Sequence, residues 1–185
     1  MPSVTIDLYQ LLKEEIGNGS PNLVTRETGR IIRERLEREL EKAEVVYLDF
    51  SKIGIIDYSC ADEIIAKLVS RLLSGEYGDK YIVLAGINEN QKENIAVALE
   101  RKDLAVMAQM RNGNKFLIGS LNNYLQKTLE LILKKGKITA GELSDIFKLP
   151  ANTSGTRLLN LHKKKLVKRM DEMRDNGRVW VYEKI

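Results

Sequence analysis

Polar and basic side chains recur on one side of a predicted helix near residues 153–164. If Leu158, Leu161 and Leu166 face a core, the other side of this helix is polar. That side carries Ser154, Arg157, Asn160 and Lys164. Arginine can bind guanine and asparagine can bind adenine in the major groove, while serine and lysine hold phosphates. Thr153, at the helix start, offers a hydroxyl and a backbone N–H to a phosphate. The spacing predicts a recognition helix for double-stranded DNA.

Two further arginines flank a turn that follows this helix. Arg174 and Arg178 stand on either side of Asp175-Asn176-Gly177, between two runs with strand character. A hairpin there would place both arginines to reach a neighbouring backbone or minor groove. Tyr124, Trp180 and Tyr182 alternate with apolar residues, so we expect them to pack in the core or the hairpin.

The elements around the helix have a definite order. An apolar face runs from Leu121 to the glycine at 136, and a Thr139–Glu142 capping box opens a second helix that ends before Pro150. Helix, helix, helix, hairpin over residues 120–185 resembles the winged helix-turn-helix superfamily, as does the run Ile-Thr-Ala-Gly-Glu-Leu-Ser at 138–144. The resemblance implies a small α+β winged-helix domain that binds DNA.

The charge distribution agrees with this division of the chain. Residues 121–185 hold 14 basic and 7 acidic side chains, a net charge of +7, whereas residues 1–120 have a net charge of −3. A basic segment attached to a mildly acidic body is typical of a polyanion-binding module. The alternative is that the basic helix face is simply solvated, on a domain used for protein contacts or dimerisation.

Residues 1–119 alternate strand and helix signals. Buried strands are predicted at 45–50 and 81–87, each followed by a helix, and Asn112-Gly113 predicts a hairpin. Residues 3–9 are predicted as an edge strand, before a charged amphipathic helix from Thr25. The pattern predicts an α/β domain with a mixed sheet.

One junction in this region carries a second resemblance. The run Asp57-Tyr58-Ser59-Cys60 resembles the STAS domain of anti-sigma factor antagonists. The runs Ser59-Cys60-Ala61-Asp62-Glu63 and Arg26-Glu27-Thr28-Gly29 resemble the smaller STAS-like family. The resemblance implies a sensor or switch domain rather than an enzyme, with Ser59 at the phosphoacceptor position and a protein kinase or anti-sigma-like protein as partner.

The same residues also have a purely structural interpretation. Ser59, followed three positions later by Asp62, is close to a capping box, which is the slightly favoured reading. A phosphate on Ser59 would be favoured by the helix N-terminus and opposed by Asp57, Asp62 and Glu63. Cys60 is expected to pack as a small buried side chain.

Several classes of protein are disfavoured by composition. With one cysteine, Cys60, and one histidine, His162, the chain has no internal disulfide and no pair of metal ligands of these types. Metal binding by Asp57, Asp62 and Glu63 is a weaker interpretation than helix capping. We therefore expect no metal, no cofactor and no catalytic activity. No apolar run reaches the ~18 residues of a membrane helix, which predicts a cytoplasmic protein without membrane contact.

These observations predict a cytoplasmic transcriptional regulator in which a STAS-like domain changes the presentation or homodimerisation of a winged-helix DNA-binding domain. The alternative is a protein-interaction switch of the antagonist type, in which the winged helix serves for docking or dimerisation.

Overall fold

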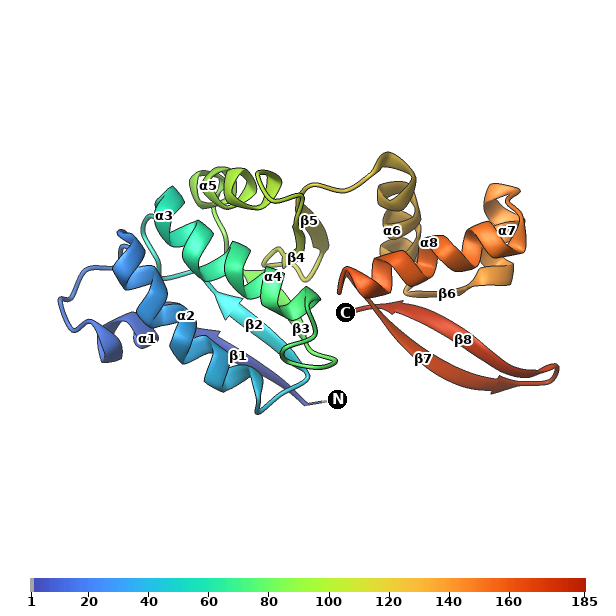
Figure 1. Cartoon of the computed structure of the whole chain (residues 1–185), viewed down its shortest axis with the longest axis horizontal. Coiled ribbons are helices and arrows are strands. Elements are labelled where there is room, and N and C mark those ends of the chain that lie inside the picture. Colours follow the sequence, from blue (N-terminus) through green and yellow to red (C-terminus); the bar gives the residue numbers. More distant parts are fainter. Residues whose placement is uncertain (1) are drawn as a thin grey trace. The chain divides into compact units, whose positions relative to one another are not determined.

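The computed structural model describes residues 2–185, and the chain divides into two compact units, Met1–Ser120 and Leu121–Ile185. The division falls one residue after the boundary predicted between residues 119 and 120. Figure 1 shows the elements of both units along the chain.

The first unit is an α/β fold around a five-stranded sheet. Its elements are β1 (Ser3–Asp7), α1 (Leu8–Glu15), α2 (Arg26–Leu40), β2 (Val45–Asp49), α3 (Tyr58–Ala61), the π-helical turn η1 (Asp62–Ala66), α4 (Lys67–Leu73), β3 (Tyr81–Ala85), α5 (Glu89–Glu100), β4 (Ala105–Gln109) and β5 (Lys115–Gly119). The strand order is β1-β2-β3-β4-β5, with parallel pairing up to β4 and an antiparallel β5. The predicted mixed sheet is confirmed.

Alternate strand residues build the core of this unit. Val46, Leu48, Ile82 and Leu84 are buried in one apolar cluster with residues of α2, α4 and α5. Figure 1 shows α2 lying alongside the α3–α4 segment over the sheet. Because the side chains of a strand alternate between faces, each of these strands presents a continuous apolar row to the helices.

The predicted strand at residues 3–9 ends earlier in the structure, whereas the predicted hairpin is confirmed. β1 is an edge strand, as predicted, but it stops at Asp7 because the Asp7 carboxylate accepts a hydrogen bond from Gln10 N (3.0 Å) and caps α1. The predicted hairpin is present, with residues 110–114 joining β4 to β5.

The second unit combines three helices with a three-stranded antiparallel sheet. Its elements are α6 (Asn123–Lys135), β6 (Lys137–Thr139), α7 (Ala140–Phe147), α8 (Ala151–Lys163), β7 (Val167–Arg174) and β8 (Gly177–Lys184). The sheet order is β6-β8-β7. Sequence patterns indicated the three helices and the hairpin but not β6, whose three residues are too few to show a strand period.

Local signals fix the ends of these helices. Gly136 ends α6 with a φ of 89°, and Thr139 and Glu142 form the predicted capping box at the start of α7. Lys148 ends α7 in the left-handed conformation, with a φ of 55°, and Pro150 precedes α8. The connection from α7 to α8 is therefore short, which restricts the direction that α8 can take.

Candidate functional site

Helix α8 is anchored by one apolar face and by a hydrogen bond to α7. Leu158 and Leu161 are fully buried, and so is Ser154. The Ser144 hydroxyl donates a hydrogen bond to the Ser154 hydroxyl at 2.9 Å. The prediction that Ser154 lies on the exposed polar face is therefore wrong. Its buried hydroxyl accepts a hydrogen bond that links α8 to α7.

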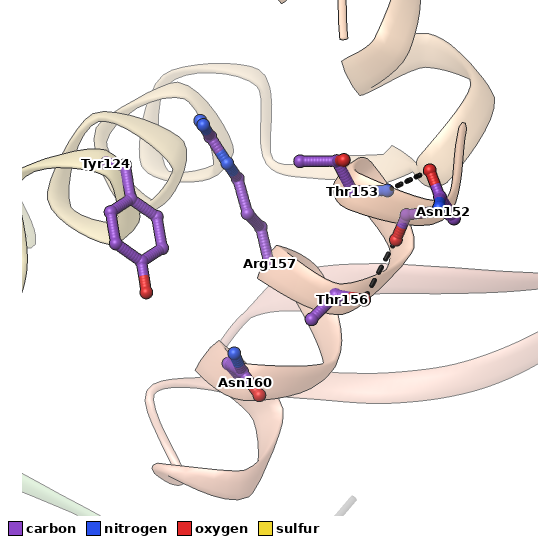
Figure 2. Close-up of a pocket in the computed structure, with 6 residues that line it drawn as sticks. All are labelled: Tyr124, Asn152, Thr153, Thr156, Arg157 and Asn160. Carbon is purple, nitrogen blue, oxygen red and sulfur yellow. Dashed lines mark hydrogen bonds between the residues drawn. The ribbon is translucent and has the colours of Figure 1, made fainter. Parts of the chain in front are cut away.

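The opposite face of α8 borders an open hollow of about 360 Å³. Its lining consists of Tyr124 from α6 and Asn152, Thr153, Thr156, Arg157 and Asn160 from α8. Figure 2 shows these side chains, with Arg157 extended from α8 on the side of Tyr124. Three of the predicted residues, Thr153, Arg157 and Asn160, are thus brought together.

The start of α8 differs from the predicted cap. The helix begins at Ala151 after Pro150, and no side chain caps it. The Asn152 carboxamide oxygen accepts from Thr153 N (2.9 Å), so the backbone N–H predicted to bind a phosphate is already engaged. The Thr156 hydroxyl donates to Asn152 O at 2.9 Å (Figure 2). Thr153 keeps its hydroxyl on the hollow, but its predicted backbone contact is not supported.

Two side chains on this face have spare hydrogen-bonding capacity. Within residues 2–185, no side-chain hydrogen bond is found for Asn160, and no carboxylate pairs with Arg157. The Arg157 guanidinium lies over the Tyr124 ring, 5.1 Å from its centroid. A planar guanidinium and a carboxamide on one open face can form bidentate hydrogen bonds with base edges.

Lys164 takes a different place from its predicted partners. It is the C-cap residue that follows the last residue of α8, its backbone N donates to Asn160 O at 3.0 Å, and the residue is half-buried. It does not line the hollow, and its positive charge suits a sequence-independent attraction to a phosphate.

The hairpin arginines are both held by carboxylates. Arg174 pairs with Glu142 of α7 at 3.3 Å and with Glu172 at 3.5 Å, and Arg178 pairs with Asp171 across the strands. All of these groups are substantially exposed, so each pair contributes only ~0–1 kcal/mol. A phosphate can therefore compete for either arginine at small cost.

Sequence reasoning missed three residues of this site, Asn152, Thr156 and Tyr124. Thr156 shares a face with Thr153 and Asn160, and its spacing of three and four residues from them is a signal that could have found it. Tyr124 was expected in the core, but 43% of it is exposed. Only the packing of α6 against α8 places its ring beside Arg157.

The motifs at Arg26–Gly29 and Ser59–Glu63 in the first unit also converge. Arg26 donates to Asp62 (3.0 Å) and to Glu63 (3.1 Å). A Cβ on Gly29 would lie 2.9 Å from Glu63 Cβ and 3.2 Å from Cys60 Cα, so this glycine permits the close approach of α2. The two motifs, far apart in sequence, form one contact between helices.

Asp57, not Ser59, caps this helix. The Asp57 carboxylate accepts from Cys60 N (2.7 Å) and from Thr25 N (3.1 Å), and the helix begins at Tyr58. The predicted capping box of Ser59 and Asp62 is therefore wrong, because Asp62 is committed to Arg26. Ser59 lies half-buried in the first turn.

Buried carboxylates in this cluster are neutralised by cations. Burial raises the pKa of Glu63, but the ammonium of Lys67 (2.6 Å) and the guanidinium of Arg33 (3.3 Å) outweigh it and hold that pKa below its usual value. Burial is likewise outweighed at Asp62, whose pKa is lowered by Lys102 (2.6 Å) and Arg26. No group of three metal-ligating side chains occurs in the part of the chain that is described.

Cys60 is buried, as expected for a packed side chain. Burial raises the pKa of its thiol to about 12, and the thiol donates to Thr25 O at 2.9 Å. A thiol with that pKa is almost entirely protonated near neutral pH, which makes it a poor nucleophile.

Comparison of the chain with protein-family models, with curated proteins and with solved structures finds no match. Across residues 2–185, every helix is too short or too polar to traverse a lipid bilayer.

Proposed function

We propose that the chain is a DNA-binding transcriptional regulator, in which the second unit is a winged-helix module and the first a STAS-like sensor or switch. The observation that carries the proposal is the exposed face of α8, where Arg157 and Asn160 have side chains available for base contacts. The protein acts by binding, in the cytoplasm, and the proposal includes no catalytic step and no cofactor.

Two further features support this assignment. The order helix, strand, helix, helix, hairpin in the second unit is that expected of a winged helix, with α8 in the position of the recognition helix. The net charge of +7 over residues 121–185 favours a polyanionic partner. The hairpin arginines Arg174 and Arg178 would then contact the backbone or the minor groove beside the site.

Binding of the full chain to duplex DNA at several salt concentrations tests the proposal. Selection of bound duplexes from a random pool first supplies the preferred site. We expect the logarithm of the affinity for that site to fall steeply and linearly with the logarithm of salt concentration, because phosphate contacts release counterions. A protein that selects no sequence and shows no salt-dependent duplex binding is not such a regulator.

A second candidate function is a protein-interaction switch centred on Ser59, with a kinase or anti-sigma-like partner and the winged helix used for docking or as a homodimer contact. Ser59 precedes Asp62 and Glu63 by three and four residues in one continuous helix, so all three share a face. Both carboxylates are paired with cations, including Arg26, whose side chain is 53% exposed. This pairing removes much of the repulsion expected between a phosphate on Ser59 and these carboxylates.

Mass spectrometry of the protein isolated from its native cell tests the switch. We expect a phosphopeptide containing Ser59 that disappears in a Ser59→Ala chain. Native protein that remains unmodified at Ser59 under all growth conditions argues against this second function and leaves the DNA-binding proposal standing.

A further inference from the structure

Tyr124 occupies an unusual position for an aromatic residue on the first helix of its unit. Its ring is 43% exposed, while its neighbours Leu125 and Thr128 are buried and fix α6 in place. The Thr128 hydroxyl donates to Tyr124 O at 2.8 Å, and the Asn122 carboxamide donates to the Tyr124 hydroxyl at 3.2 Å. The ring is thus carried by a rigid helix and presented to solvent beside α8.

The contact of this ring is with Arg157. The guanidinium lies 5.1 Å from the ring centroid, within the range of a cation–π interaction. Figure 2 shows the arginine side chain extended beside the ring, with Thr153 on its other side. A long arginine side chain otherwise has many rotamers, and ordering it on binding DNA has an entropic cost.

The pair also separates two hollows on the surface of the unit. Tyr124 and Arg157 line both the hollow on α8 and a second open hollow of about 560 Å³. The second hollow is completed by Asn123, Lys127, Phe147 and Leu149. Without the ring, the guanidinium is free to turn toward either hollow, and only one of them adjoins Asn160.

We propose that Tyr124 is a positioning residue for DNA recognition, whose ring holds the Arg157 guanidinium in the orientation from which it contacts a base. This inference rests on the proposed DNA-binding function. It adds a residue of α6 that lies 29 positions before the predicted recognition residues begin at Thr153. Tyr124 itself need not touch the DNA; it acts by restricting where Arg157 can point.

The test uses the full chain and three single variants, Tyr124→Phe, Tyr124→Leu and Arg157→Ala, with the double variant Tyr124→Leu/Arg157→Ala. Phenylalanine keeps the ring and removes only the hydroxyl, so we expect its affinity for the selected duplex to stay within about 2-fold of the unmodified chain. We expect Tyr124→Leu to weaken binding to that duplex by about 3- to 10-fold and to relax discrimination at the base that Arg157 contacts. Affinity for random-sequence duplex should change little.

The double variant shows whether Tyr124 acts by positioning Arg157 or by contacting the DNA itself. If Tyr124 acts only through Arg157, Tyr124→Leu has no further effect in the Arg157→Ala background, a strongly non-additive cycle. Gln126→Ala, an exposed change on the same helix, is the matched control and should leave binding unchanged. Additive effects of Tyr124→Leu and Arg157→Ala overturn the inference, since the ring would then contribute without the arginine.

A measurement without DNA tests the stack itself. The Arg157 Nε–H resonance in the free protein should be shifted by the ring current in the unmodified chain and in Tyr124→Phe, and the shift should vanish in Tyr124→Leu. Equal resonances in all three chains overturn the inference. Absence of any duplex binding overturns the proposed function together with it, whereas duplex binding that is equal in the unmodified chain and Tyr124→Leu overturns the positioning role alone.

Discussion

Gly29 and Glu63 are packed so closely that a Cβ on the glycine would lie 2.9 Å from the Cβ of the glutamate. The backbone of Cys60 stands on the same side, with its Cα 3.2 Å from that position. Neither the glutamate Cβ nor the helix backbone can move away without shifting the helix. The glycine of the Arg26–Gly29 motif therefore has a steric explanation: it sets the distance between α2 and the helix that carries Ser59.

Gly29→Ala should destabilise the first unit. Alanine favours a helix over glycine, yet the clash requires α2 to shift, which costs about 1–3 kcal/mol of unfolding free energy. Urea denaturation followed by circular dichroism measures the change. Gly155→Ala in α8 is the contrasting control, because a Cβ there meets no atom within 4 Å among the described residues, and it should stabilise by up to ~1 kcal/mol. A stabilising Gly29→Ala would show that the helices separate easily.

Glu63→Gln should be costly near neutral pH. The Glu63 side chain is only 2% exposed and pairs with the buried Arg33, so its neutralisation leaves that guanidinium with one carboxylate fewer and should cost about 1–3 kcal/mol. Glu34→Gln removes an exposed partner of Arg30 and should change stability by less than ~0.5 kcal/mol. Denaturation at pH 7 compares the two variants.

The same glutamate predicts a pH dependence. Its pKa in the folded chain is lower than its ordinary value of 4.5, so the stabilisation from the charged form is present above that pH. It is lost as the pH falls through the lowered pKa, and the depressed pKa of Asp62 acts in the same direction. The acid limb of a stability curve should be less steep for Glu63→Gln than for the unmodified chain. If stability falls equally steeply with pH in Glu63→Gln and in the unmodified chain, the acid-induced loss of stability comes from other carboxylates.

Arg157→Ala and Lys164→Ala should weaken DNA binding in different ways. Removing Arg157 should cost about 1–3 kcal/mol on the selected duplex and relax preference at one base pair, because the contact proposed for its guanidinium is with a base edge. Removing Lys164 should weaken binding to all sequences and lower the salt slope by about one. Competition between the selected duplex and single-base variants checks both. Equal loss of discrimination in the two variants would refute these roles.

Ser154→Ala should affect folding rather than recognition. The change removes one member of the hydroxyl pair between α7 and α8 and should cost ~1 kcal/mol of stability. Its affinity for duplex DNA, measured well below the unfolding temperature, should match that of the unmodified chain. If the affinity of this variant for duplex DNA depended less steeply on salt concentration, Ser154 would instead be a phosphate contact.

Much of the fold could be predicted from the sequence, because the sequence signals for its elements are local. The alternation of buried strands with helices from residue 45 onward, the Asn-Gly hairpin, and the capping box at Thr139 and Glu142 each depend on residues within a few positions of one another. The strong apolar period of α8 likewise identified Leu158 and Leu161 as buried. Spacing on one helix also grouped Thr153, Arg157 and Asn160 correctly.

Tertiary packing decided which side chains join the candidate site and which are buried at its edge. A helix contacts several neighbouring elements, and its own sequence does not show which side chains face each of them. Ser154 lies at the edge of the apolar face of α8, and only the proximity of Ser144 turned it inward. The Asp57 carboxylate that caps its helix also accepts a hydrogen bond from Thr25 N, 32 residues earlier. Tyr124 joined the candidate site through the contact between α6 and α8. No local pattern encodes such contacts, whose partners are distant in sequence and are brought together only by the assembled core.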